Sequence, residues 1–201
     1  MVKIIREDYY FEEPGPQNTD DVIEAVAKRV ETTKIKHVIV ASHTGETALK
    51  FAKALKGKAS VICVTPAPSR RERGREWPSL KAEFRKELEH LGVLIVERAP
   101  YAMENSVLEY SRWNIPTQDR LVKEVLYRFG QGMKVAVQVM FMAVSGGYVE
   151  SNQEVIAVGG TGKGADCAVV LKASYPEFLF AEDSKKRLEV REVIAMPRKK
   201  E

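Results

Sequence analysis

A chain of 201 residues has the length of one globular domain with room for a short appendage. Its 44% hydrophobic and 30% charged residues exclude wholesale disorder, and its only two cysteines, Cys63 and Cys167, lie too far apart to indicate a disulfide scaffold. No long uncharged apolar run is present, and acidic residues stand near the start where a signal peptide needs an apolar centre, so we expect a cytosolic protein without a membrane segment.

The net charge of +4 is concentrated in two short segments. Residues 69–75 (SRRERGR) hold four arginines and one glutamate, and residues 198–201 (RKKE) are also basic, so the rest of the chain is close to neutral. Nucleic-acid binding generally requires a broad basic face. We therefore favour a solvated loop for 69–75 over a nucleic-acid contact through its four arginines.

The first half of the chain predicts alternating helices and strands. A helix is expected after residue 18, because Asn18 or Thr19 can cap it and valines recur at a spacing of four from Val22. Three continuous apolar runs then predict buried strands, at 37–41, 59–64 and 93–96. The segments between them predict helices at 46–55 and 80–91.

Continuous apolar strands are typical of a parallel sheet that is covered by helices on both faces. We therefore expect a three-layer α/β fold with a mostly parallel sheet of five to six strands. The single domain is expected to span 1–201, with residues 1–17 as an irregular arm.

The middle of the chain predicts three helices. A short one is expected over 101–110, and an amphipathic one over 117–129, where Leu121, Val125 and Phe129 recur at a spacing of four. Residues 133–144 are apolar apart from Lys134 and Gln138. Their valine content suits a strand, but their length and the two glycines that follow favour a buried helix.

The last part of the chain predicts strands at 155–158, 168–171 and 193–195. Their short connections predict antiparallel partners at that edge of the sheet.

A first candidate for phosphate binding is the turn at 42–47 (SHTGET), between the first strand and its helix. Such a turn supplies free backbone N–H groups and the positive end of the helix dipole. Gly45 would allow close approach of the backbone to a ligand, and Ser42, Thr44 and Thr47 add hydroxyl donors. An ordinary capping turn, with Glu46 favourable in the first helical turn, explains the same residues.

A second candidate is the segment 159–164 (GGTGKG), which follows a predicted strand. It departs from the P-loop pattern, because Gly164 follows Lys163 where Ser or Thr is required. Gly160, Gly162 and Ala165 fit the looser G-x-G-x-x-A pattern, but a strand rather than a helix is expected next. Close approach of the backbone to a ligand and a plain flexible hairpin are equally good explanations of these glycines.

The expected topology brings the two loops together. Ligands of doubly wound sheets bind outside the carboxyl ends of strands, where the direction of winding reverses. If the fourth strand returns beside the first, the two loops face each other across that crevice, with Thr65 on its floor. The candidate ligand-binding residues are Ser42, His43, Thr44, Gly45, Glu46, Thr47, Thr65, Gly159, Gly160, Thr161, Gly162 and Lys163.

Residues 19–97, with the segments VIVASHTGETA and ASVICVTP, resemble the C-terminal domain of pyruvate kinase. In that family the turn that matches residues 42–47 holds a phosphate of the allosteric sugar bisphosphate. The resemblance therefore favours phosphate binding at this turn more strongly than the spacing does. Nothing in the chain resembles the catalytic barrel of pyruvate kinase, so pyruvate kinase activity is not expected.

The whole chain is more similar to a group of stand-alone archaeal proteins that resemble the pyruvate kinase alpha/beta domain. The shared segments are SHTGETA, RFGQGMKVAVQ, IAVGGTGKGADCAVVLKAS and REVIAMPR. This resemblance implies a mostly parallel sheet with an antiparallel edge, and it implies flavin mononucleotide (FMN) as a cofactor. Gln138 could then reach the edge of a flavin ring, although a hydrogen-bonded amide on the side of a helix is the favoured interpretation.

Other reactive residues give weaker signals. His37, His43 and His90 show no metal-binding spacing, and only His43 lies in a candidate site. Cys63 is expected in the core, and Cys167 follows the glycine loop with no base in view to activate it. Trp77 and Trp113 are expected to anchor loops or a subunit contact.

These observations lead to a hypothesis of a small FMN-binding protein whose phosphate is held at Ser42–Thr47. A flavin-dependent redox reaction is compatible with it, but the residues indicate no substrate. The alternative is a sensor of a sugar phosphate or nucleotide that carries out no chemistry. The expected partner is a phosphate-bearing small molecule, with association into a homo-oligomer compatible with either hypothesis.

Overall fold

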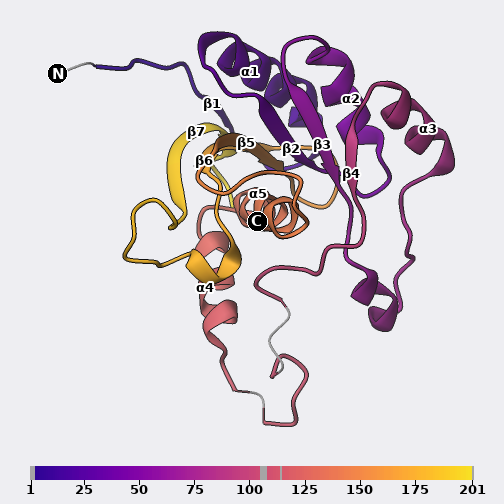
Figure 1. Ribbon diagram of the computed structural model, residues 1–201, viewed down its shortest axis with the longest axis vertical. Helices are drawn as coiled ribbons and strands as arrows, with labels where there is room; N and C mark the ends of the chain where they lie inside the picture. Colours follow the sequence, from indigo (N-terminus) through magenta and orange to yellow (C-terminus); the bar gives the residue numbers. More distant parts are fainter. Residues whose placement is uncertain (1–2, 105–107, 114, 201) are drawn as a thin grey trace.

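A seven-stranded sheet runs through the middle of the molecule (Figure 1), as shown by a computed structural model that describes residues 3–104, 108–113 and 115–200. The strands lie in the order β1 (Tyr9–Phe11), β7 (Glu189–Pro197), β6 (Cys167–Lys172), β5 (Glu154–Gly159), β2 (His37–Ala41), β3 (Ser60–Val64) and β4 (Leu94–Val96). All pairs are parallel except those of β6, which is antiparallel to both its neighbours. The mostly parallel sheet, with antiparallel pairing among the late strands, confirms the predicted fold class.

Helices cover both faces of this sheet (Figure 1). On one face α1 (Thr19–Thr32), α2 (Glu46–Ala54) and α3 (Ala82–His90) pack over Val38 and Val40 of β2. On the other face α5 (Gln131–Ser145) packs over Ile39, with α4 (Gln118–Tyr127) beside it. Successive side chains of β2 therefore pack into two separate hydrophobic cores, one on each face of the sheet, and this explains why its sequence is apolar without interruption.

The N-terminal arm contains a strand that the sequence analysis did not predict. β1 pairs with β7, so the sheet has seven strands rather than five or six. Behind it, the buried guanidinium of Arg29 forms ion pairs with Asp8 (2.8 Å) and with Glu192 on β7. A strand of three residues carries little pattern of its own, and these tertiary contacts are what hold the arm in place.

The central helix α5 confirms the prediction of a buried helix rather than a strand. Nearly every residue from Gly132 to Val144 is buried, and the helix ends where the backbone N–H of Gly146 donates to the Met142 carbonyl at 3.0 Å. Because α5 lies between the sheet and α4, most of its surface is buried, and its residues 133–144 are apolar apart from Lys134 and Gln138.

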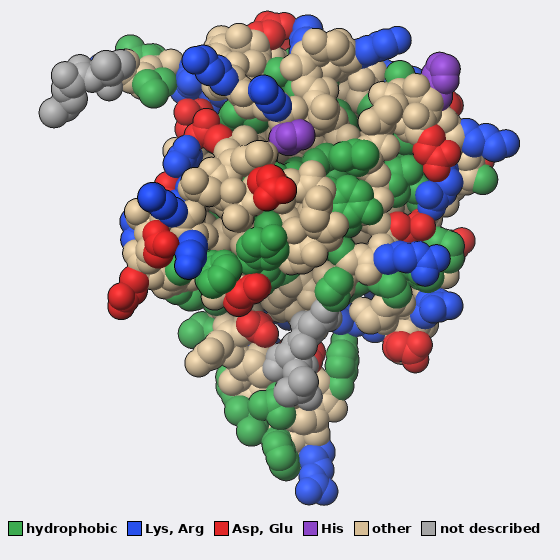
Figure 2. Space-filling view, viewed as in Figure 1, with side chains coloured by type: hydrophobic (Ala, Val, Ile, Leu, Met, Phe, Trp, Pro, Cys, Tyr) green, Lys and Arg blue, Asp and Glu red, His purple; other side chains and the backbone are tan. Residues whose placement is uncertain are grey.

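The amphipathic helix α4 begins as predicted but turns a different face to the core. Thr117 caps it, because its hydroxyl accepts the backbone N–H of Arg120 at 3.2 Å. Val122 and Leu126 pack on the core, whereas Leu121 and Val125 are 66% and 52% exposed. The predicted core stripe is thus largely a surface feature, and Figure 2 shows hydrophobic side chains over the part of the surface where Figure 1 places α4 and the loop before it.

The short helix expected over 101–110 is not formed by the residues that can be described. Residues 105–107 lie outside the described residues, and their flanking residues 101–104 and 108–110 form no helix. Within the described chain, no helix combines the length and the apolar character of a membrane span.

Candidate functional site

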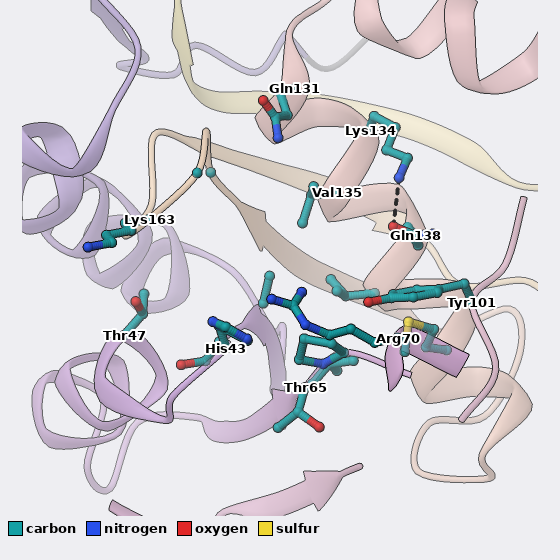
Figure 3. Close-up of a pocket in the computed structure, with 18 of the residues that line it drawn as sticks. His43, Thr47, Thr65, Arg70, Tyr101, Gln131, Lys134, Val135, Gln138 and Lys163 are labelled. Carbon is teal, nitrogen blue, oxygen red and sulfur yellow. Dashed lines mark hydrogen bonds between the residues drawn. The ribbon is translucent and has the colours of Figure 1, made fainter. Parts of the chain in front are cut away.

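A cleft of about 940 Å³ lies at the carboxyl ends of β2 and β3, and both candidate loops line it (Figure 3). β3 and β4 lie on one side of β2, and β5 lies on the other, so the winding reverses at β2. The carboxyl ends of β2 and β5 point the same way because the two strands are parallel. The turn after β2 and the β5–β6 loop therefore meet at one edge, as the sequence-based topology predicts.

The turn after β2 presents backbone donors to this cleft. The buried Ser42 hydroxyl accepts the backbone N–H of Ala48 at 3.2 Å, and the Ser42 N–H donates to Val64 at 2.9 Å, so this residue fixes the turn. Among the described residues, no acceptor is found for the backbone N–H groups of residues 43–47, which precede or begin α2. Free N–H groups at a helix N-terminus are a ready anion site.

Gly45 serves packing rather than approach to a ligand. It is buried and lies outside the cleft lining, with a φ of 100°. A Cβ there would lie 2.5 Å from Leu80 Cδ1 and 2.8 Å from Phe84 Cβ, so α3 and the segment before it fill the space that the sequence analysis assigned to a ligand. The same segment holds the turn from behind, because Ser79 donates its hydroxyl hydrogen to the His43 carbonyl at 2.7 Å.

The β5–β6 loop is also shaped by packing. Gly160, Gly162, Lys163 and Gly164 line the cleft, whereas Gly159 and Thr161 do not. A Cβ on Gly159 would lie 2.1 Å from the Gly132 carbonyl oxygen, so α5 can approach β5 only because this residue is glycine. Packing thus explains Gly159, whereas Gly162 has open space around it.

Asp166 holds this loop and the N-terminal arm together, a role that the sequence analysis missed. Its side chain is fully buried, and one carboxylate oxygen accepts the backbone N–H groups of Gly15 at 2.9 Å and of Thr161 at 3.0 Å. The other oxygen, Oδ1, has no hydrogen-bond partner within the described structure. Burial raises the pKa of Asp166, and the hydrogen bonds from Thr161 and Gly15 oppose that shift.

The arginine-rich segment is a wall of the cleft rather than only a solvated loop. It forms the 3-10 helix Pro68–Arg73, and Trp77 anchors it by donating its indole N–H to the Pro66 carbonyl at 3.0 Å and by stacking with Arg71 at 4.9 Å. Trp77 is thus the loop anchor that was predicted, whereas Trp113 is 61% exposed. The segment reaches the cleft because it follows the carboxyl end of β3, which ends at Val64 as the sequence predicted.

Cations outnumber carboxylates around the cleft by seven to three. The cations are Arg70, Arg73, Arg75, Lys81, Lys123, Lys134 and Lys163, and the carboxylates are Glu46, Glu104 and Glu109. Glu104 pairs with Arg73 and Lys134, and Glu109 pairs with Lys123. Arg70 lines the cleft and interacts there with the Tyr101 phenol, and its buried Nε has no hydrogen-bond partner among the described residues.

Figure 3 shows two ends of the cleft, with Arg70 and Val135 between them. His43, Thr47 and Lys163 group at the first end. The protein around His43 removes part of its hydration, which lowers the pKa of the imidazole, and the charges of Arg70 and Arg75 act in the same direction. Thr65 is buried beneath the cleft, with its N–H bonded to the Val96 carbonyl at 3.0 Å.

The other end is built on Lys134 and Gln138 of α5. Lys134 donates to the Gln138 amide oxygen at 2.9 Å and to Glu104, while the Gln138 amide nitrogen donates to the Ala102 carbonyl at 2.8 Å. Gln138 is thus the hydrogen-bonded amide that the sequence favoured, and it lines the cleft as well. Burial lowers the pKa of Lys134, and the nearby Glu104 carboxylate limits this shift.

Burial acts to raise the pKa of Glu104, but its hydrogen bonds and charge interaction with Lys134 outweigh that effect and lower it. The carboxylate is therefore ionised at neutral pH. The site residues that sequence reasoning missed are Arg70, Tyr101, Glu104 and Lys134. Two of them gave a signal: Arg70 belongs to the arginine-rich segment, which was interpreted as a solvated loop, and Lys134 is a charge in an otherwise apolar run four residues before Gln138.

The cysteines are separate buried thiols. Burial raises the pKa of Cys63 to about 12 and also raises that of Cys167, so neither is a nucleophile at neutral pH. The described residues bring no three His, Cys, Asp or Glu side chains together as a metal site.

Comparison with known protein families identifies the family to which this sequence belongs. The sequence model of the family described as pyruvate kinase, alpha/beta domain, matches residues 20–171. The chain belongs to this family. The matched residues include the turn after β2, the arginine-rich segment, α5 and the β5–β6 loop, so every wall of the cleft lies within the matched region. The arm with β1 and the strand β7 lie outside the matched residues.

Proposed function

We propose that this protein binds a phosphorylated small molecule in the cleft, with FMN as the first choice, and that the phosphate lies at the Ser42–Thr47 turn. The observation that carries the proposal is the set of backbone N–H groups at the start of α2 that have no acceptor among the described residues, in a turn of which His43, Thr44, Glu46 and Thr47 line the cleft. Lys163 stands at the same end, and Arg70, whose Nε has no hydrogen-bond partner among the described residues, lies between this end and the other. Backbone donors, a helix dipole and fixed cations are together what a phosphate dianion requires.

The size and composition of the cleft also suit a ligand larger than phosphate. Its volume of about 940 Å³ is near the upper end of the range for small-molecule and cofactor sites. FMN itself is supported by the resemblance to the archaeal group rather than by a contact in the cleft. Once bound, FMN would supply hydride or one-electron redox chemistry.

A direct test is titration of FMN with the purified protein, followed by flavin fluorescence and by thermal unfolding. Saturable quenching is expected, together with a rise in the melting temperature. Lys163→Met should weaken binding by about tenfold, because a charge-assisted hydrogen bond to phosphate contributes about 1.4 kcal/mol or more. Lys86→Met on α3, a lysine outside the cleft lining, is the matched control. Absence of both quenching and thermal shift at millimolar FMN would refute the assignment of FMN.

A sensor of a sugar phosphate or nucleotide is the second candidate. It is favoured by the pairing of Glu104 and Glu109 with cations, since carboxylates held in ion pairs serve binding better than proton transfer. A ligand at a hundred times its dissociation constant adds about 2.7 kcal/mol of stability, which is roughly 5–10 °C for a domain of this size. A panel of sugar phosphates and nucleotides would identify such a ligand, and a uniform lack of shift would exclude this candidate.

A further inference from the structure

The second end of the cleft is unlike a phosphate site. One face of α5 runs along the cleft to this end and lines it with four apolar or neutral polar side chains and the Lys134–Gln138 pair; the residues are Gln131, Lys134, Val135, Gln138, Val139 and Met142. They recur at intervals of three and four, so they share one helix face. An apolar wall with a few fixed polar groups is typical of a subsite for an organic group.

Lys134 is the most telling residue of this wall. Its side chain is 5% exposed, and a buried ammonium is costly unless it is paired. Its carboxylate partner, Glu104, also pairs with Arg73 at 3.1 Å, so two cations share one carboxylate and the group keeps an excess positive charge. An electron-rich acceptor in the cleft would complement that charge.

Aromatic rings flank the same place. The Lys134 ammonium lies 5.8 Å from the centre of the Tyr127 ring, and Arg73 lies 5.7 Å from that of Tyr101. Both tyrosines line the cleft, and burial raises the pKa of each phenol, so both rings are neutral at physiological pH. Figure 3 shows Tyr101 beside Lys134 and Gln138 and across from the His43 end.

We propose that this end of the cleft is a ring subsite, which binds the planar heteroaromatic ring of the ligand whose phosphate lies at the Ser42–Thr47 turn. Lys134 donates to acceptor atoms on the ring edge, and Gln138 is a positioning residue that holds the ammonium. Tyr101, Tyr127 and Val135 supply flat and apolar contact. The inference rests on the proposed phosphate site, and it adds that the protein selects phosphates that carry a ring over those that do not.

The test compares the dissociation constants of FMN and of ribose 5-phosphate, which has the phosphate but no heteroaromatic ring. Calorimetric titration of the full chain should give at least tenfold tighter binding of FMN. The double variant Lys134→Met/Glu104→Gln removes the buried ammonium and its carboxylate partner together, so neither is left buried with an unpaired charge. It should weaken FMN by about 10- to 100-fold and leave ribose 5-phosphate within twofold.

Two further variants separate the ring subsite from the phosphate site. Lys163→Met, at the first end, should weaken both compounds by the same factor. Tyr101→Ala should weaken FMN alone by at least fivefold, since stacking on an aromatic side chain is lost. Thermal unfolding of each variant shows whether it is folded, and the Tyr101→Ala variant tests the inference even if the double variant is not.

The outcomes are distinguishable. Equal weakening of both compounds in the Lys134→Met/Glu104→Gln and Tyr101→Ala variants, or equal affinity of the wild type for both, would refute the ring subsite and leave phosphate binding in place. If the wild type bound neither compound, the phosphate site and with it the ring subsite would be refuted.

Discussion

Gly159→Ala is the sharpest test of how the cleft is built. A Cβ at this position would lie 2.1 Å from the Gly132 carbonyl oxygen and 2.8 Å from the Ala136 nitrogen. Both contacts are with the backbone of α5, so no side-chain rotation can relieve them. Ordinary contact begins at 3.4 Å, and α5 must therefore move away from β5 by about 1.3 Å, the difference between 3.4 and 2.1 Å.

Overpacking of this kind costs about 3 kcal/mol, at the upper end of the usual range, because the obstacle is main chain. For a domain of about 200 residues this lowers the melting temperature by roughly 6–12 °C, which calorimetry measures directly. Gly162→Asn in the same loop is the matched control. It has open space around its Cβ, and Asn tolerates its φ of 78°, so a change below about 3 °C is expected. An unchanged melting temperature for Gly159→Ala would refute the assigned packing role.

Three further predictions follow from the same structure. Burial raises the pKa of Asp166 in the folded state above its unfolded value, so the stability that it contributes is full below the unfolded pKa and declines as pH rises through the folded pKa, by up to about 1.4 kcal/mol per pH unit. Urea unfolding of Asp166→Asn from pH 4 to 7 should lack this decline. Parallel pH dependences for the variant and the wild type would contradict the prediction. Leu121→Gln should change the free energy of unfolding by less than about 0.5 kcal/mol, because the Leu121 side chain is 66% exposed. Phe141→Ala in α5 should lower the free energy of unfolding by about 3–5 kcal/mol, because the Phe141 ring is fully buried. A large effect at Leu121 would show that this surface is covered in solution. Arg70→Met should weaken FMN about tenfold and flatten the salt dependence of binding, and an unaltered salt dependence would place the phosphate elsewhere.

The parts of the fold that the sequence predicted are those in which local pattern and tertiary environment agree. The strand β2 is buried on both faces of the sheet, so its continuous apolar run correctly predicted a buried strand. Most residues of α5 are also buried, and its long apolar run correctly predicted a buried helix. The meeting of the two loops followed from topology, because parallel neighbours end at one edge. Neither step required knowledge of side-chain contacts.

Where the prediction was wrong, tertiary contacts decided the outcome. The arm becomes a strand because it pairs with β7 and because Arg29 of α1 forms ion pairs both with Asp8 of the arm and with Glu192 of β7. Along α4, Leu121 and Val122 are adjacent and equally apolar, and only the position of the core determines which of them is covered. The sequence around Gly45 fits a phosphate-binding turn, but in the structure the missing side chain makes room for Leu80 and Phe84. This contact with α3 and the segment before it cannot be predicted from the local sequence.

The glycines and the buried polar residues of this domain therefore carry different information. Gly45 and Gly159, in the two candidate loops, are explained by packing and lie outside the cleft lining, so their presence is weak support for a ligand. A lysine inside an apolar helix is more informative, because removing its charge from water has no compensation in packing. Lys134 is stabilised by Glu104 and Gln138, and all three groups line the cleft. The cost of burying this charge at the cleft wall is the strongest reason to look for recognition of the ligand at this end as well as at the phosphate turn.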